Sequence, residues 1–212
     1  MISILVANIK GGCGKSTVAT QLAGAFAAAG HSTVLADVDP QRSSLGWVKR
    51  RPITAAPITG LDWSKDVGDL PRGATRLVID APAAMKKGAI EDLVRQADVI
   101  VLPVLPSALD EGATTRFLKK LDDLKPIRRN RKPVAVLGNR MKPRSKASAE
   151  LDHYLGEIGH EVVARLRDSA AYAELARDGL SMFDLRSPRA KTLREDWAPL
   201  LAFIEAEEGE KR

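Results

Sequence analysis

Eight consecutive residues near the amino terminus constrain the fold of this chain more than any other feature of its sequence. They read Lys10-Gly11-Gly12-Cys13-Gly14-Lys15-Ser16-Thr17. The run before them, Ile2–Ala7, is short, apolar and rich in β-branched residues, which is typical of a buried strand. After them, apolar residues recur at helical spacing as far as Ala29, and Gly30 supplies a stop signal. A strand, a glycine-rich turn and a helix in this order are the context in which backbone N–H groups bind phosphate.

The chemistry of this segment fits the phosphates of a nucleotide. Its glycines let the backbone curl so that N–H groups point inward, and the following helix adds the positive end of its dipole. The Lys15 ammonium is expected to pair with the β- and γ-phosphates, and the Ser16 hydroxyl to ligate Mg²⁺. The predicted nucleotide-binding residues of this segment are Gly11, Gly12, Cys13, Gly14, Lys15, Ser16 and Thr17.

The spacing of the glycines is a variant of the usual phosphate-loop motif. The first glycine of the standard pattern would fall at Ile9, and a dinucleotide fingerprint beginning at Gly12 would need glycine at Thr17. The pattern K-G-G-x-G-K-[ST] instead resembles the ParA/MinD family of deviant Walker-A ATPases. In that family two subunits sandwich two ATP molecules, and the additional lysine, here Lys10, reaches the phosphates held by the partner subunit. The resemblance implies an ATP-dependent homodimer in which Lys10 and Lys15 contribute to catalysis.

Two later segments match the same family. Asp37-Val38-Asp39-Pro40-Gln41 resembles its D-x-D-P-Q motif, which makes Asp39 the candidate that orients the attacking water and Asp37 a candidate support of the metal shell. Leu77–Pro82 resembles a Walker-B strand, in which Asp80 would hold Mg²⁺ through water. The candidate metal site therefore comprises Ser16, Asp37 and Asp80. All three acids are predicted at the carboxyl ends of parallel strands, where such sheets bind ligands.

The nucleotide base has one candidate contact. Val136–Arg140 resembles the family segment in which a strand-end asparagine lies, and the Asn139 amide could read the edge of adenine because it both donates and accepts hydrogen bonds. The pair Gly138-Asn139 is equally typical of a turn.

Buried strands alternate with helices along the chain, which predicts an α/β fold: a doubly wound, mostly parallel sheet with helices on both faces, in a single domain over residues 1–212. Pro52–Gly73 is the least regular segment and is expected to form loops around a short edge element. The further predicted strands are Thr33–Val38, Arg76–Ile79, Val99–Val104, Pro133–Leu137 and Val162–Leu166. The further predicted helices are Ser43–Arg50, Ala89–Gln96, Glu111–Leu124, Ser148–Ile158, Ala170–Arg177 and Ala190–Ala206.

The charge of the chain suggests a polyanionic partner. The formal net charge is +6 and the pI is about 9.5. Nine basic residues and no acid lie between Lys125 and Lys146: Lys125, Arg128, Arg129, Arg131, Lys132, Arg140, Lys142, Arg144 and Lys146. Family relatives bind DNA nonspecifically through C-terminal basic residues of the ATP dimer, so the resemblance makes Arg165, Arg167 and Arg189 candidate contacts to double-stranded DNA.

The resemblance also implies a ParB-like or cargo-adaptor protein that stimulates slow hydrolysis. The cargo would be a chromosome, a plasmid or a protein assembly. A single cysteine, and the lack of a signal peptide or a long apolar run, predict a cytoplasmic protein. The resemblance implies that this protein associates with the nucleoid.

Alternatives from the same family are a membrane-associated MinD-like ATPase and a metabolic relative. A membrane helix would need a basic polar face, whereas the apolar stripe of Ala190–Ala206 is flanked mostly by acids, which favours packing on the core. Metal-cluster relatives need ligating cysteines, and only Cys13 is present. A bacterial tyrosine kinase would need a C-terminal tyrosine cluster, and the chain has only Tyr154 and Tyr172.

Overall fold

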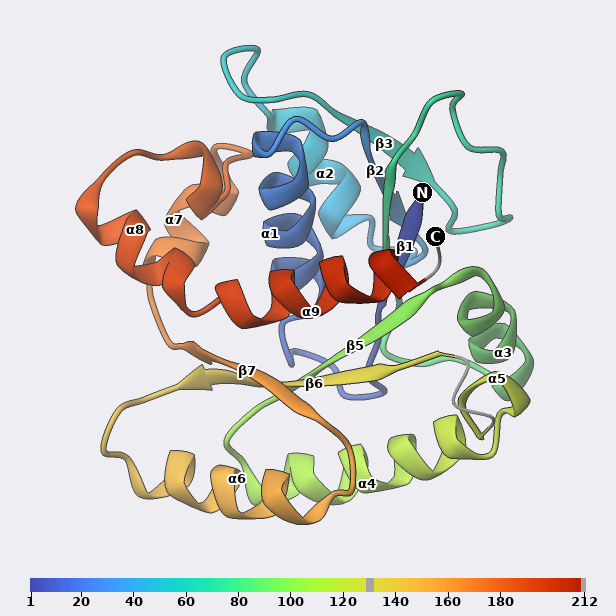
Figure 1. The fold of residues 1–212 in the computed structure, drawn as a ribbon, viewed down its shortest axis with the longest axis vertical. Coiled ribbons are helices and arrows are strands. Elements are labelled where there is room, and N and C mark those ends of the chain that lie inside the picture. Colours follow the sequence, from blue (N-terminus) through green and yellow to red (C-terminus); the bar gives the residue numbers. More distant parts are fainter. Residues whose placement is uncertain (129–131, 211–212) are drawn as a thin grey trace.

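Seven strands form one parallel sheet in a computed structural model that describes residues 1–128 and 132–210 (Figure 1). The strand order is β3-β2-β4-β1-β5-β6-β7. Every residue of β1, β2, β4 and β5 is buried, as continuous apolar runs in a covered parallel sheet predict. The bounds are β1 Ile2–Val6, β2 Thr33–Asp37, β3 Ile58–Asp62, β4 Arg76–Asp80, β5 Val99–Val104, β6 Val134–Met141 and β7 Val162–Arg167.

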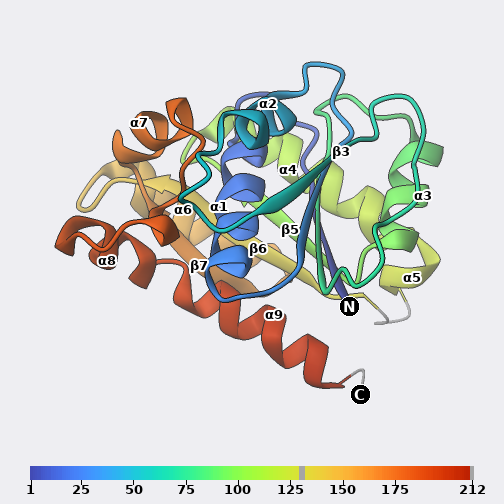
Figure 2. The ribbon, with the colours of Figure 1, turned by 90° about the horizontal axis from the view of Figure 1, so that it is seen from above.

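Helices cover both faces of the sheet (Figures 1 and 2). The first face carries α1 Lys15–Ala28, α2 Ser43–Arg50, α7 Ala171–Arg177, the 3-10 helix η1 Met182–Asp184, α8 Pro188–Glu195 and α9 Ala198–Glu210. The second face carries α3 Lys87–Gln96, α4 Ala108–Asp122, α5 Lys125–Arg128 and α6 Lys146–Glu157. The predicted doubly wound α/β architecture is therefore confirmed.

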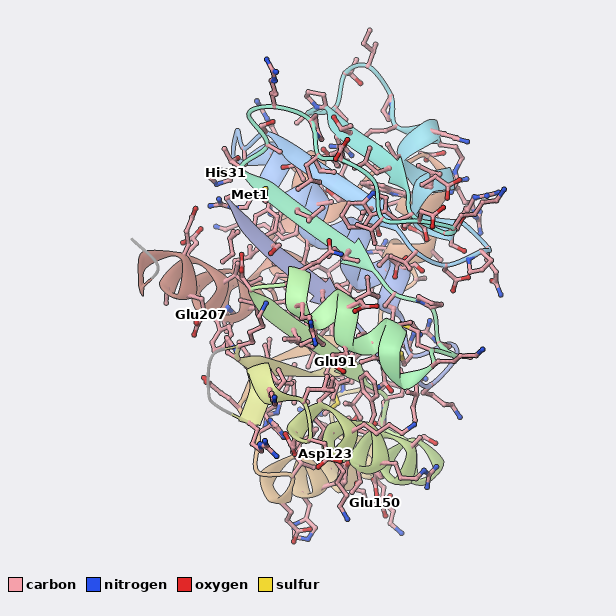
Figure 3. All side chains as sticks on the ribbon, turned by 90° about the vertical axis from the view of Figure 1, so that its right-hand side faces the viewer. Met1, His31, Glu91, Asp123, Glu150 and Glu207 are labelled. Carbon is pink, nitrogen blue, oxygen red and sulfur yellow. The ribbon has the colours of Figure 1, made fainter. Side chains whose placement is uncertain are left out.

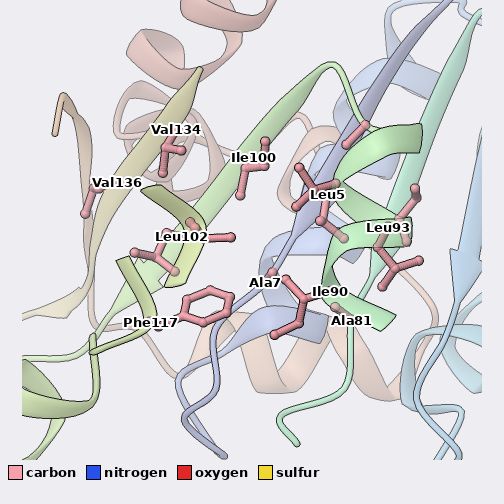
Figure 4. Packing of buried hydrophobic residues seen from close by; sticks show 14 of the residues in the cluster. Leu5, Ala7, Ala81, Ile90, Leu93, Ile100, Leu102, Phe117, Val134 and Val136 are labelled. Atoms are coloured by element: carbon pink, nitrogen blue, oxygen red, sulfur yellow. The ribbon is translucent and has the colours of Figure 1, made fainter. Parts of the chain in front are cut away.

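The central strand β1 divides its side chains between two hydrophobic cores. Ile2 and Ile4 pack toward α1 and α9, whereas Leu5 and the following Ala7 pack toward α3 and α4, where Phe117 is fully buried (Figure 4). Alternation along a strand that is buried on both faces explains why the run is apolar throughout. A rigid, fully covered central strand fixes the position of the loop that follows it.

The predicted helix Ala190–Ala206 is wrong in one respect, because the structure has two helices there. Pro188 stands at the start of α8, Ser187 caps it, and the chain turns at Asp196 and Trp197 before α9. The turn lets the Asp196 carboxylate accept hydrogen bonds from Arg167 and lets the fully buried Trp197 donate its indole N–H to the Tyr172 hydroxyl at 3.0 Å. Tertiary partners on β7 and α7 therefore interrupt an otherwise helical pattern.

Other boundaries also move. The irregular segment between α2 and β4 contains β3, a parallel strand at the sheet edge, as expected. Strand β6 continues to Met141, past the predicted end at Leu137, so Gly138 and Asn139 lie inside a strand and not in a turn. The helix predicted over 111–124 begins at Ala108, and α5 follows it.

Helix α9 lies across the first face of the sheet and buries its apolar stripe there. Leu200 is fully buried and Ile204 is 1% exposed, and Trp197, directly before the helix, is also fully buried. Its far end is tied to β4, because Arg76 donates to both carboxylate oxygens of Glu208, at 2.7 and 3.1 Å. This end of α9, marked by Glu207, and the sheet edge marked by Met1 and His31 lie on the same side of the molecule (Figure 3). The expectation that this helix packs on the core is confirmed.

Among the described residues, no helix has the length and apolarity that a membrane crossing would require.

Candidate nucleotide-binding site

The phosphate loop leaves the carboxyl end of β1 and enters α1 directly. Gly12 and Gly14 have φ angles of 75° and 94°, in the left-handed region that favours glycine. Gly14 precedes the first residue of α1 without a side-chain cap, so the backbone N–H groups of the first helical turn are not satisfied by a capping side chain. The loop thus provides the curled backbone and helix dipole that the sequence predicts for phosphate binding.

The two lysines of the loop differ in their surroundings. Lys15 is 8% exposed, and its ammonium donates to the backbone carbonyl of Lys10 at 3.0 Å and lies 3.9 Å from the Cys13 sulfur. The side chain of Lys10 is half-buried, and its backbone N–H donates to Oδ1 of Asn8 at 3.1 Å. Lys15 is therefore already folded over the loop, and its contact with phosphate oxygens stays a prediction. The contribution of Lys10 to a second subunit stays a prediction.

Asp37 and Asp39 follow β2 and form one hydrogen-bonded unit. Asp37 is fully buried, and its two oxygens accept from the backbone N–H groups of Asp39 at 3.0 Å and Leu45 at 2.9 Å. Asp39 is half-exposed, and its carboxylate accepts from the Gln41 N–H at 2.9 Å. Asp37 therefore fixes the backbone at Asp39 and the first turn of α2, while the Asp39 carboxylate remains accessible.

Asp80 ends β4, the strand between β1 and β2, and stands in register with both Val6 and Asp37. Asp80 is 1% exposed, and neither of its carboxylate oxygens accepts a hydrogen bond from the described part of the chain. Burial raises the pKa of Asp80 to about 7, although the nearby hydroxyls of Ser16 and Ser44 lower it. A buried carboxylate without a bonded partner is the kind of group that a cation would satisfy.

These residues fit Mg²⁺, which takes oxygen ligands and keeps several waters. Among the described residues, no group of three or more His, Cys, Asp or Glu side chains could hold a metal. The ion would therefore depend on the Ser16 hydroxyl, on the carboxylates of Asp80 and Asp37, and on phosphate oxygens and water. Ser44, whose buried hydroxyl also has no hydrogen-bond partner within the described structure, is a neighbour that the sequence motifs did not indicate.

Asn139 lies beneath the phosphate loop. It is 7% exposed, and its amide donates to the Cys13 carbonyl at 2.8 Å and accepts from the Arg140 N–H at 3.0 Å. A Cβ atom on Gly14 would lie 2.4 Å from the Asn139 nitrogen, so this position has no room for a side chain. The structure therefore places Asn139 at the loop, and its contact to adenine stays a prediction.

Asn8 is a site residue that sequence reasoning missed. It is 1% exposed and donates to the Pro103 carbonyl of β5 at 2.9 Å, in addition to accepting from Lys10. The available signal was a polar side chain directly after an apolar strand, at the carboxyl edge of the sheet.

The three candidate DNA-binding arginines all have acidic partners. Arg165 forms an ion pair with Asp152. Arg167 forms a bidentate ion pair with Asp196, with both hydrogen bonds 2.7 Å long. Arg189 lies 3.9 Å from Glu174. Strand β6 also divides the described part of the basic run from Lys125 to Lys146. Lys125, Arg128 and Lys132 precede the strand, whereas Lys142, Arg144 and Lys146 follow its carboxyl end. Arg129 and Arg131 lie outside the described residues.

The half of this run that follows β6 borders a surface hollow at the carboxyl edge. The hollow has a volume of about 690 Å³, and its lining includes Lys142, Arg144, Lys146, Arg165 and Arg167. Basic side chains therefore gather at the sheet edge that also carries the phosphate loop. DNA binding by this edge stays a prediction.

Comparison with known proteins agrees with this geometry. Residues 4–182 match the model of the CobQ/CobB/MinD/ParA nucleotide binding domain. A protein of Gloeobacter kilaueensis named maintenance of carboxysome distribution protein A is 32% identical over 205 residues, covering 92% of this chain and 89% of that protein. A protein of the same name from Halothiobacillus neapolitanus is 28% identical over 190 residues, covering 86% and 87%.

Among solved structures, the ATP complex of a Cyanothece McdA variant superposes with a TM-score of 0.73, at 17% identity, over 94% of this chain and 96% of that one. At this identity the likeness shows the fold. The match to the family model over most of the chain, together with the Gloeobacter relative, shows more: this chain belongs to the CobQ/CobB/MinD/ParA nucleotide binding domain family.

Proposed function

We propose that this chain is a ParA-like positioning ATPase. It binds ATP and Mg²⁺, forms an ATP-dependent homodimer, binds DNA without sequence preference, and uses hydrolysis to ADP and phosphate to distribute a cargo. The observation that carries the proposal is the convergence of three adjacent strand ends: the phosphate loop after β1, the buried Asp80 at the end of β4, and the Asp37–Asp39 pair after β2. Phosphate cradle, metal-ligand candidates and a candidate for orienting water thus share one edge.

The residues of the chain divide the work of hydrolysis between them. Lys15 would exchange its bond to the Lys10 carbonyl for phosphate oxygens. Ser16, Asp37 and Asp80 would hold Mg²⁺, which would supply positive charge close to the β- and γ-phosphates. The half-exposed Asp39 carboxylate would orient the attacking water, with its backbone fixed by Asp37. Lys10 of a second copy would add a cation only on dimerisation, which would couple association to the nucleotide.

The proposed biological setting follows the relatives. Two of them are named for carboxysome distribution, which supports a protein assembly as cargo, with a plasmid or chromosome as the other cargo classes. A cargo-adaptor or ParB-like protein would stimulate hydrolysis, and the dimer would reside on the nucleoid in the cytoplasm. The basic residues around the carboxyl-edge hollow support contact with DNA phosphates.

The structure weakens the membrane alternative for the described C-terminal helix. Leu200 and Ile204 of α9, and Trp197 directly before the helix, are buried on the core, so these apolar side chains are not available to a bilayer in the described structure.

The proposal is tested by measuring MgATP binding, phosphate release and the elution volume with and without ATP. The wild type should bind MgATP, hydrolyse it slowly and elute as a dimer with ATP. Lys15→Ala should lose ATP binding, because it removes the main cation facing the phosphates. Lys65→Ala, which removes an exposed lysine on the loop after β3, serves as a control and should behave as the wild type. Normal ATP affinity in Lys15→Ala would refute the site assignment.

A further inference from the structure

Two buried asparagines connect the phosphate loop to the strands beside it. Asn8 lies at the entrance of the loop, and its amide links the Pro103 carbonyl of β5 to the backbone N–H of Lys10, at 2.9 and 3.1 Å. Asn139, near the carboxyl end of β6, donates to the Cys13 carbonyl in the middle of the loop at 2.8 Å. The loop is therefore tied at two points to two different strands.

The contacts of Asn139 depend on two backbone features nearby. Arg140, the next residue, has a φ angle of 53°, which is costly for a residue with a side chain, and its N–H donates to the side-chain oxygen Oδ1 of Asn139 at 3.0 Å. Gly14 must lack a side chain for the amide to reach the loop. The left-handed backbone at Arg140 and the absence of a side chain at Gly14 therefore both accompany the contact between Asn139 and Cys13.

We propose that Asn8 and Asn139 are positioning residues that hold the phosphate loop in its phosphate-binding shape, independently of the base. The proposal rests on the nucleotide site proposed above. Asn8 fixes the backbone at Lys10, and the Lys10 carbonyl is in turn the acceptor for the Lys15 ammonium. Asn139 fixes the backbone at Cys13, one residue before the left-handed Gly14. Loss of either tie leaves a carbonyl or N–H of the loop without its buried partner and widens the range of loop conformations.

A ligand without a base separates positioning from base recognition. We would measure binding of Mg-tripolyphosphate and of MgATP to the full chain by calorimetry, in the wild type, Asn8→Leu and Asn139→Leu. Leucine has the branched shape and the number of side-chain heavy atoms of asparagine and adds no charge, whereas aspartate would repel the phosphates by itself. The matched control is Gln21→Leu, because Gln21 is an equally buried amide that accepts from the Met182 N–H at 2.9 Å, away from the loop.

We expect both asparagine variants to bind both ligands about tenfold more weakly, by the same factor for each ligand. Gln21→Leu should lose thermal stability but keep its affinities. Should the leucine variants fail to fold, Asn8→Ser and Asn139→Ser remove the same contacts with a smaller side chain. Unchanged affinities would overturn the proposal, and so would a loss restricted to MgATP, which would assign Asn139 to the base alone. A wild type that binds neither ligand would instead refute the nucleotide site itself.

Discussion

The backbone N–H of Asp39 is held by the carboxylate of Asp37 at 3.0 Å, while the second oxygen of the same carboxylate caps α2 through the N–H of Leu45. One buried side chain therefore links the loop after β2 to the helix that follows it. Asp39 is half-exposed, and its bond to Asp37 uses the backbone N–H and not the carboxylate. The arrangement gives the first acid of the D-x-D motif a structural role beside its proposed place at the metal, and it leaves the second acid available for chemistry.

Asp39→Ala should bind ATP normally but hydrolyse it at least about a hundredfold more slowly, since it would remove the group proposed to orient water without touching the phosphate loop. The ATP-bound dimer should accumulate. Phosphate release and size-exclusion chromatography with ATP measure both effects. Asp66→Ala, at an exposed position on the loop after β3, provides the control. Unchanged turnover in Asp39→Ala would remove Asp39 from the mechanism.

The stability of the nucleotide-free protein should depend on pH through Asp80. Its pKa is about 7 in the folded protein, mainly because of burial, and about 4 in an unfolded chain. The folded state therefore keeps a proton that the unfolded state loses between pH 4 and pH 7, so the free energy of unfolding falls as pH rises through this window.

Asp80→Asn removes this titration, so its stability curve should be flatter and should exceed that of the wild type at pH 8, by up to about 4 kcal/mol. Urea unfolding at pH 5, 6, 7 and 8 without Mg²⁺ measures the difference, and Asp69→Asn, at an exposed position, is the control. Parallel curves for Asp80→Asn and the wild type would show that Asp80 is ionised throughout.

DNA binding should require ATP, lack sequence preference and weaken as salt rises, because each neutralised phosphate releases a counterion. Two copies of one basic surface in a dimer would make the second contact intramolecular. Titrations with ATP or ADP against two unrelated duplexes at two salt concentrations test this. Sedimentation with anionic vesicles, combined with no DNA binding in ATP at low salt, would favour the membrane alternative.

Among the candidate arginines, Arg189 offers the cleaner test. Its side chain is 64% exposed and is loosely paired, whereas Arg167 is bonded to a carboxylate that is only 12% exposed. Arg189→Glu should therefore lower affinity equally for both duplexes while ATP-driven dimerisation persists, and Arg167→Glu should also destabilise the fold. Lys120→Glu, on α4 over the opposite face of the sheet, is the control, and full affinity in Arg189→Glu would exclude that residue.

The ion pair between Arg76 and Glu208 should stabilise the docked α9 helix. Arg76 is 5% exposed at its side chain, so Glu208→Ala leaves a buried charge without its main partner and should cost about 3 kcal/mol of unfolding free energy. Glu205→Ala removes an exposed acid from the same helix and should cost little. Thermal unfolding compares the two, and equal melting temperatures would show that apolar contacts alone hold α9.

The sequence by itself determined the phosphate loop, the acids that follow β2 and β4, and the parallel sheet. These features are local: a phosphate cradle is built from consecutive residues, and a buried strand must be apolar over its whole length. The carboxyl-end position of Asp37 and Asp80 then follows from strand direction, and the structure places both side by side in register.

The tertiary structure alone decided which distant groups meet. The Asn139 amide reaches a carbonyl 126 residues earlier, Arg167 pairs with Asp196, and β6 separates the described residues of the acid-free basic run. The C-terminal helical pattern breaks where Asp196 and Trp197 find partners on β7 and α7. Such pairings depend on strand order and on helix placement over the sheet, and residue type and spacing specify neither of these.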